Sequence, residues 1–274
     1  MNTTKSTTTS KLICYPEIPY LEIRLTTKSE RIYEAHAHPT LSLGVMLEGQ
    51  TLFRTSKGEF LLQKGGLAII EPHMQHACNP YKEEKRSYFM VYIDASFCAK
   101  IQHTFFQNET ETLLPLSSSL IYHKALFEDF LEVITALSKG YSPLHVKVLE
   151  TWLEQFLWLY TKRGQVKNLD DDLAKVVHFL ENRMDESISL AELSNRFNVN
   201  PFVLSRHFKK AFGCTPKHYW LDMRIHHAKK LLQEGISISL CAQYCGFVDQ
   251  SHFHRFFKRR TALTPKEYQV NFIQ

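Results

Sequence analysis

The sequence lacks the features of secreted, membrane-spanning and most catalytic proteins. None of its apolar runs is long enough to cross a bilayer, and the Thr- and Ser-rich residues 1–10 have no apolar core of a signal peptide. The six cysteines are scattered without a C-x-x-C pair, which favours reduced thiols in a cytoplasm. We find no Ser-His-Asp set, paired carboxylates or glycine-rich phosphate loop, so we expect no enzyme. These absences predict a cytoplasmic protein that does not interact with membranes.

The most informative feature that is present is an internal repeat between Ser189 and Tyr268. Matching residues are separated by the same 49 positions (for example 257 − 208) in the pairs Leu204/Phe253, Arg206/Arg255, Phe208/Phe257, Lys209/Lys258, Pro216/Pro265 and Tyr219/Tyr268. A repeat of this kind indicates two copies of one structural unit.

Each copy has the pattern of two helices joined by a tight turn. The turn needs a residue that tolerates positive φ, and Asn198 and Gly246 fall at this point in the two copies. In the second helix of each copy, apolar residues are spaced to point inward: Leu204 and Phe208, then Phe253, Phe256 and Phe257. A helix from about Pro216 to Gln233 is expected to join the copies rigidly, so that they can read two successive major grooves of DNA.

The outward faces of these second helices are polar and basic. From Arg196 to Gln274 there are 13 Lys and Arg against 4 Asp and Glu, a net charge of +9 (13 − 4), while the whole chain carries +5. Such concentrated charge favours DNA over the alternative of a helical bundle with a solvated basic face. We expect base contacts from Phe202, Ser205, Arg206, Gln250, Ser251, His252 and Arg255. Phosphate contacts are expected from Lys209, Lys210, Lys258, Arg259 and Arg260.

These motifs resemble the DNA-binding domain of AraC/XylS-type transcription regulators. The resemblance rests on Gly246-Phe247, Asp249-Gln-Ser, Phe253, the two Arg-x-Phe-Lys runs and the two Thr-Pro-x-x-Tyr endings, and it covers about residues 170–272. The sequence departs from the family pattern where Ala262 replaces a usual Gly, Ser194 a usual Ala, and Cys241 an aliphatic residue. A left-handed turn at Ala262 would be mildly strained.

The N-terminal part has the pattern of many short strands. Runs rich in β-forming residues are separated by Gly, Pro, Lys or Glu, at Leu21–Leu25, Leu41–Leu47, Thr51–Thr55, Gly58–Leu62, Leu67–Ile70 and Ser87–Ile93. Strands without intervening helices suggest a sandwich or barrel.

Histidines cluster within these strands. Alternation along a strand places His36 and His38 on one face, and His76 on a neighbouring strand would complete a group of three imidazoles. Together with Gly49, Gly65 and the Pro72-x-x-x-His76 spacing, they resemble the cupin-like sensor domain of many AraC-type regulators. Metal-binding cupins usually add a Glu where this chain has Ser42-Leu43. We keep open whether the three His line an effector pocket, pair with backbone carbonyls, or bind a divalent metal.

The region from Ser119 to Lys162 changes to a helical period. One helix is expected to begin at Leu120, and a second begins at Ser142-Pro143. The second helix carries two apolar stripes, one of Trp152, Phe156 and Leu159 or Tyr160, and one of Leu149, Leu153 and Leu157. One stripe can pack within the chain, and the other can pack on a second copy in a homodimer.

We therefore predict a multidomain α+β protein with a cupin-like β-barrel, a helical linker and an all-α domain with two helix-turn-helix units. The expected divisions are a disordered tail at 1–11, a sensor domain at 12–112, a helical dimerisation and linker region at 113–168, and a DNA-binding domain at 169–274. The predicted function is a transcription regulator controlled by a small-molecule effector, with promoter DNA and RNA polymerase as partners. The alternatives are a metal-dependent cupin enzyme with a DNA-binding appendage and an architectural DNA binder without an effector.

Overall fold

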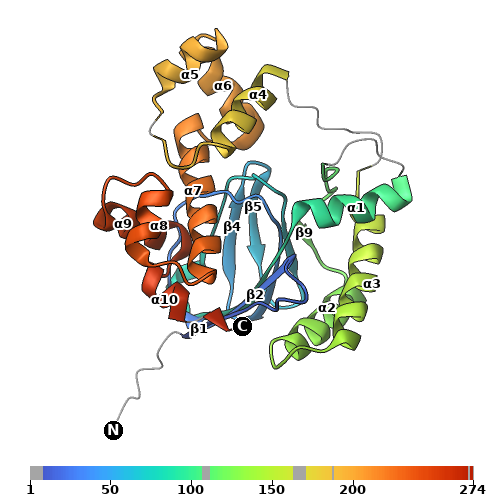
Figure 1. Cartoon of the computed structure of the whole chain (residues 1–274). Helices are drawn as coiled ribbons and strands as arrows, with labels where there is room; N and C mark the ends of the chain where they lie inside the picture. The colour runs from blue at the N-terminus through green and yellow to red at the C-terminus, as the bar shows by residue number, and fades with distance from the viewer. Residues whose placement is uncertain (1–8, 107–111, 163–170, 187, 271, 274) are drawn as a thin grey trace.

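The computed structural model of the chain describes residues 9–106, 112–162, 171–186, 188–270 and 272–273. Figure 1 shows a central β-rich domain, three helices on one side of it, and the C-terminal helices on the other side. The predicted combination of an N-terminal β-rich domain with a C-terminal helical domain is confirmed. Residues 163–168 at the end of the expected linker region, and residues 1–8 of the expected tail, lie outside the described residues.

The β-rich domain contains two sheets. The larger sheet has the strand order β10-β1-β2-β8-β3-β6-β9, and the smaller has the order β5-β4-β7. The strands are β1 Thr9–Ile13, β2 Leu21–Ser29, β3 Leu41–Glu48, β4 Thr51–Thr55, β5 Gly58–Leu62, β6 Leu67–Ile70, β7 His76–Pro80, β8 Arg86–Ile93, β9 Leu120–Ile121 and β10 Phe272–Ile273. The predicted bounds of β4, β5 and β6 are confirmed, while β2, β3 and β8 are longer than predicted.

The larger sheet is buried on both faces. One face packs on three helices through residues such as Leu43, Val91 and Phe130, and the other faces the smaller sheet through Met46 and Phe53. This burial explains why six consecutive residues of β3, from 41 to 46, are buried although an exposed strand face would alternate.

The three helices beside the sheet are α1 Ala95–Phe106, α2 Lys124–Leu137 and α3 Pro143–Tyr160. Helix α1 was not predicted, although Asp94 gives a capping signal because its side chain accepts hydrogen bonds from the backbone N–H of Ser96 and Phe97. Leu120 lies in β9 and not in a helix, because its segment pairs with β6. Helix α2 begins only after His123, whose ring accepts from Leu126 N.

The predicted start of α3 is confirmed, and of the two expected coverings for its stripes the structure has packing within the chain. Ser142 caps the helix and Pro143 occupies its first turn. Both stripes are mostly covered by the chain itself, because Trp152, Phe156 and the Leu149/Leu153/Leu157 set are buried in the core. Only Leu159, of the residues named in the stripes, is exposed.

The helical domain contains α4 Asp171–Glu181, α5 Leu190–Phe197, α6 Pro201–Phe212, α7 Pro216–Gln233, α8 Ile238–Tyr244, α9 Gln250–Thr261 and α10 Pro265–Val270. The two turns have the predicted left-handed residues, with φ of 49° at Asn198 and 64° at Gly246. Helix α7 has the predicted bounds and contributes to both apolar clusters, one around each helix-turn-helix unit. The two units therefore share α7 as a common packing element.

The two domains are joined by more than the linker. Strand β10, at the C-terminal end, pairs in parallel with β1 through Leu12 and Ile13. The side chain of Leu12 is buried in the core of the second helix-turn-helix unit. Because β1 begins at Thr9, residues 9–11 belong to the sheet and not to the tail that the sequence predicted.

Candidate nucleic-acid interface and junction pocket

The second helix of each helix-turn-helix unit is fixed by a side-chain cap and an apolar face. The Oδ1 of Asn200 accepts from Phe202 N at 2.9 Å before α6, and the Oδ1 of Asp249 accepts from His252 N at 2.6 Å before α9. Inward residues, such as Phe208 and Phe257, are fully buried. The predicted inward positions are therefore the ones that anchor these helices, and their opposite faces are free to contact DNA.

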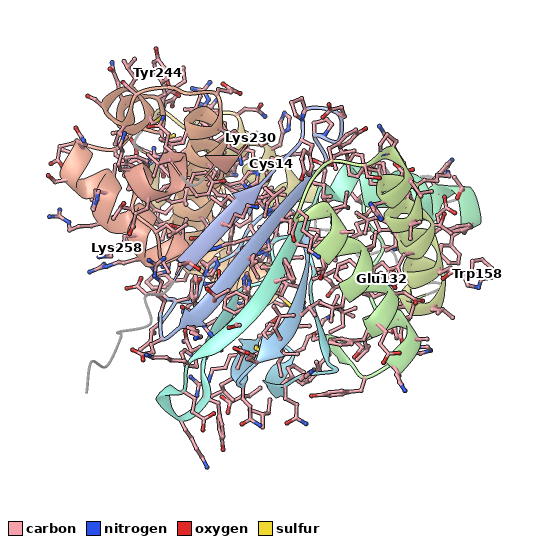
Figure 2. All side chains as sticks on the ribbon, turned by 90° about the horizontal axis from the view of Figure 1, so that it is seen from below. Cys14, Glu132, Trp158, Lys230, Tyr244 and Lys258 are labelled. Carbon is pink, nitrogen blue, oxygen red and sulfur yellow. The ribbon has the colours of Figure 1, made fainter. Side chains whose placement is uncertain are left out.

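Most of the predicted DNA-contacting residues lie on these outer faces. The exposed residues are Phe202, Arg206, Lys209, Lys210, Gln250, Ser251, Arg255, Lys258 and Arg259. Figure 2 shows Lys258 projecting outward from the helical domain. Ser205 and His252 are half-buried. The ring of His252 packs on Phe247 and Phe256, with centroid distances of 5.5 and 4.9 Å, so it faces its own unit.

Arg260 is the exception, and its predicted phosphate contact is corrected. Its side chain is buried, with Nε donating to Asp222 Oδ1 at 2.7 Å and Nη1 donating to Glu34 Oε2 at 2.9 Å. Burial raises the pKa of Asp222 to about 6, although the Arg260 charge acts in the opposite direction. A buried guanidinium held by two carboxylates is not available to a phosphate. The sequence pattern missed this because Arg260 follows two exposed cations.

The acid Glu34 belongs to the β-rich domain, so Arg260 lies at the junction of the two domains. Two further hydrogen bonds cross it: Ala37 N donates to Asp222 Oδ2 at 2.9 Å, and Arg24 Nη1 donates to the carbonyl of Thr261 at 3.0 Å. Each ties the β-rich domain to α7 or to the last turn of α9.

A second group of contacts crosses the junction at Glu22 of β2. Its carboxylate accepts from Lys229 Nζ at 2.9 Å, Gln233 Nε2 at 3.0 Å and Tyr268 Oη at 3.1 Å. The carboxylate is therefore fully engaged, and the surrounding residues come from α7 and α10. These contacts fix the helical domain against the sheet from a second side.

A pocket lies between these two groups of contacts. It has a volume of about 560 Å³, part of it open to solvent. The β-rich domain lines it with Arg24, Tyr33, His36, His38 and Tyr92, and the helical domain lines it with Asp222, His226, Lys229, Arg260 and Tyr268. A second cavity of about 340 Å³, likewise partly open to solvent, continues into the β-rich domain and shares Arg24, Tyr33, His36 and Tyr92 with the first. We call the two together the junction pocket.

The predicted convergence of the three histidines is confirmed. The ring centroid of His76 lies 4.5 Å from that of His36 and 4.7 Å from that of His38. Burial lowers the pKa of all three imidazoles, that of His76 to about 4, because the charged form loses its hydration. The neutral rings line the junction pocket.

Each of the three imidazoles has a backbone contact at Nδ1, which by itself is compatible with metal binding through Nε2. Each Nδ1 lies near a backbone carbonyl oxygen, at 2.8 Å for His36 to Glu34, 3.2 Å for His38 to Thr40 and 2.9 Å for His76 to Met74. Across the residues that the structure describes, no three His, Cys, Asp or Glu side chains are grouped so that they could hold a metal ion. This result gives no support to the divalent metal considered from the sequence.

Several residues of the junction pocket were missed by the sequence reading. Arg24, Glu22 and Lys229 carry charge but stand in an ordinary strand and an ordinary helix, so their patterns do not distinguish them from solvated residues. The signal that was available is Asp222, an acid within the otherwise basic C-terminal region. It contacts Arg260, which lies 38 residues later, and only the folded chain brings the two together.

Comparisons with known proteins agree with this geometry. Residues 19–157 match the family model described as an AraC-like ligand binding domain, and residues 193–271 match a helix-turn-helix domain. The two matches define a transcription regulator with a ligand-binding and a DNA-binding domain. The chain belongs to the AraC/XylS family of transcription regulators.

The chain is similar to named transcription regulators over most of its own length and of theirs. The chain is 28% identical to the uncharacterized HTH-type transcriptional regulator YbfI of Bacillus subtilis over 79% of this chain and 80% of that protein. It is 23% identical to the transcriptional activator RhaS of Yersinia pestis over 86% and 88%. The fold is similar to that of ToxT from Vibrio cholerae, with a TM-score of 0.63 at 14% identity over 97% and 98% of the two chains. Among the described helices, none is long and apolar enough to cross a membrane.

We expect the buried imidazole of His76 to make the protein less stable in mild acid. The pKa of this ring falls from 6.5 to about 4 on folding, so the unfolded chain binds the proton more tightly. The free energy of unfolding should therefore decrease as the pH drops from 6.5 towards 4, by about 3 kcal/mol from this group alone. Urea unfolding at several pH values should show a shallower pH dependence for His76→Gln than for the wild type. Equal pH dependence in the two proteins would contradict this expectation.

Proposed function

We propose that a small-molecule effector binds in the junction pocket and thereby controls how the chain binds promoter DNA. The observation that carries this proposal is the lining of the pocket, which comes from both domains. A ligand there contacts α7 and α9 as well as the sheet, so its binding depends on how the domains are arranged. An effector that prefers one arrangement shifts the population towards it and changes DNA affinity.

The segment 34–36 connects the pocket to the basic face of α9. The Nδ1 of His36, which lines the pocket, lies 2.8 Å from the backbone oxygen of Glu34. The side chain of Glu34 pairs with Arg260 and, at 3.5 Å, with Arg259. An acid of the β-rich domain therefore partly neutralises the cations of a DNA-contacting helix. Movement of this segment on effector binding would release Arg259 to contact phosphate.

The outer faces of α6 and α9 support a division of the DNA contacts. Arg206 and Arg255 are exposed on the faces opposite Leu204 and Phe253, where a guanidinium fork suits the edge of guanine. Phe202, Ser205, Gln250 and Ser251 lie in the first two turns and remain base-contacting candidates, whereas His252 packs on Phe247 and Phe256 and is a weaker one. Lys209, Lys210, Lys258 and Arg259 stand nearer the helix ends and suit phosphates.

The remaining partners follow from this role. ToxT, which shares the fold, has been solved with an unsaturated fatty acid bound, so a protein of this shape can hold a ligand. The name of RhaS identifies it as an activator, which supports RNA polymerase as a partner here as well. A regulator that binds promoter DNA with reduced thiols is best placed in the cytoplasm.

We also propose a homodimer formed through the exposed face of α3, in place of the stripes expected from the sequence. Leu144, Val148 and Leu159 lie on this face and are 71%, 46% and 56% exposed. A two-fold antiparallel pairing centred near Thr151 would place the Leu144 end of one copy against the Leu159 end of the other. Figure 2 shows Trp158, on the same helix, at the opposite side of the molecule from Lys258, so this pairing leaves the DNA-contacting helices free.

The first prediction concerns base recognition. Arg206→Ala and Arg255→Ala should each cost roughly 1–3 kcal/mol of affinity for a site selected from random DNA, and should relax the preference at one or two base pairs. Lys258→Ala should instead weaken binding to every sequence and lower the slope of log affinity against log salt by about one. Fluorescence anisotropy titrations measure both quantities. Equal losses on selected and random DNA for both Arg variants would exclude base reading.

The second prediction concerns the link between the domains. Glu34→Gln removes the acid that faces Arg259 and should raise DNA affinity up to about fivefold, equivalent to roughly 1 kcal/mol for an exposed pair. Glu30→Gln is the matched control, because this exposed acid of the same segment pairs with Lys85 and not with α9. The same anisotropy titration compares the two variants. If both bind DNA as the wild type does, Glu34 does not restrain the DNA-contacting face.

The third prediction concerns assembly. Leu144→Glu should give a folded monomer that binds paired sites poorly and a single site normally, because joining two units raises their effective concentration on paired sites. Lys147→Ala, on the same helix, should remain dimeric. Leu153→Glu should fail to fold, since its side chain is in the core. A wild-type monomer at micromolar concentration in light scattering would contradict the dimer.

A further inference from the structure

We propose that the ligand of the junction pocket is a small monocarboxylate, and that the guanidinium of Arg24 binds its carboxylate. The proposal rests on the proposed effector role of this pocket and adds the chemical class of the ligand. It depends on one side chain whose hydrogen bonding is incomplete, on the charges around it, and on the shape of the space next to it.

Arg24 lies in β2 and is 5% exposed. Its Nε donates to Ser10 Oγ at 3.1 Å and its Nη1 to the carbonyl of Thr261 at 3.0 Å. Its Nη2 is buried and has no hydrogen-bond partner within the described part of the chain. Both acceptors are neutral, and no described carboxylate forms an ion pair with this guanidinium. A buried cation without a counter-charge is strongly unfavourable unless something else supplies one.

The other charges of the pocket are already paired. Lys229 binds Glu22, and Arg260 binds Asp222, so neither acid is left for Arg24 and neither cation is left for a ligand. The lining therefore has three cations and two acids, a net charge of +1 (3 − 2), with neutral imidazoles beside them. A third acid, Glu34, also pairs with Arg260 from outside the lining. Arg24 is the cation of the lining that forms no ion pair with a described acid, which suits a single negative charge on the ligand.

Arg86 is a second buried arginine whose terminal nitrogens have acceptors, although its Nε has none among the described residues, and Arg31 Nη1 and Arg224 Nη2 are buried without a partner there as Arg24 Nη2 is. This second buried arginine of the β-rich domain donates from Nη1 to Thr51 Oγ1 at 2.9 Å and from Nη2 to the carbonyl of Cys78 at 2.8 Å. Its terminal nitrogens are both satisfied by the protein. Arg24 differs because its Nη2 has no such acceptor and because its side chain lines both cavities of the junction pocket.

The space next to Arg24 suits an apolar or aromatic body. The guanidinium lies over the ring of Tyr33, 5.9 Å from its centroid, and Tyr92 is a further aromatic wall. The inner cavity continues past these rings to Met90 and Cys78. A carboxylate on Arg24 would therefore direct the rest of a small ligand inward, where aromatic and sulfur-bearing side chains exclude water.

The same guanidinium touches α9, which gives the ligand a route to the DNA interface. While Nη2 holds the carboxylate, Nη1 holds the carbonyl of Thr261 in the last residue of the helix. A ligand that strengthens or weakens this contact changes the position of α9 relative to the sheet. By linkage, the factor by which the ligand changes DNA affinity equals the factor by which DNA changes ligand affinity.

The test is calorimetric titration of the full chain with straight-chain carboxylates of increasing length and with phenylacetate, each compared with its neutral amide. We expect at least one carboxylate to bind at least about tenfold more tightly than its amide, as a charge-assisted hydrogen bond provides. Arg24→Gln should remove this difference, and Arg24→Lys, which keeps the charge, should retain part of it. Arg54→Gln, an exposed arginine of the same domain, should bind as the wild type does.

The proposal is overturned if no carboxylate binds more tightly than its amide, or if a folded Arg24→Gln or Arg24→Lys protein binds the acid as the wild type does. If both variants fail to fold, the comparison of acid with amide in the wild type still tests whether the ligand is a carboxylate. Titration of the unliganded protein with selected DNA distinguishes a failure of the carboxylate proposal from a failure of the proposed function. DNA binding without a carboxylate preference removes only the ligand class, whereas loss of DNA binding removes the function itself.

Discussion

The buried ion pair between Asp222 and Arg260 is the interaction on which the arrangement of the molecule depends. It joins α7 to α9 inside the helical domain, and the same two side chains bind Ala37 and Glu34 of the β-rich domain. Removing one partner of such a pair costs about 3–5 kcal/mol, because the other charge is left buried. Loss of either partner would therefore disturb the helical domain and the domain junction together.

This pair also explains why the pocket and the DNA interface belong to one mechanical unit. The residues that close the pocket on the helical side lie on α7, on the last turn of α9 and, with Tyr268, on α10, and α7 is the helix that carries both helix-turn-helix units. A change in the pocket therefore acts on the element that sets the spacing of the two units. Rigid packing transmits such changes because a close-packed core does not deform continuously.

The sequence predicts the parts of this structure that depend on local rules. The turns at Asn198 and Gly246, the bounds of α7 and three of the strands follow from φ preferences, caps and periodicity within a few residues. Arg260 and Arg24 could not be assigned in this way, since their surroundings come from residues far away in the chain. An outward basic position and a buried ion-pair position have the same helical spacing, and only tertiary packing distinguishes them.

The two repeats differ in sequence at the stretch where the second one contacts the β-rich domain. Residues 260–262 read Arg-Thr-Ala, whereas the corresponding positions 211–213 (260 − 49 and 262 − 49) read Ala-Phe-Gly. This is the stretch that supplies the cation bound to Asp222 and the carbonyl bound to Arg24. The two copies therefore meet the β-rich domain with different chemistry. The unit at 238–268 does so through a buried ion pair and a backbone carbonyl, whereas the unit at 190–219 does so through aromatic rings, with the hydroxyl of Tyr219 at 3.0 Å from His73 Nδ1 and the ring of Phe212 against that of His73.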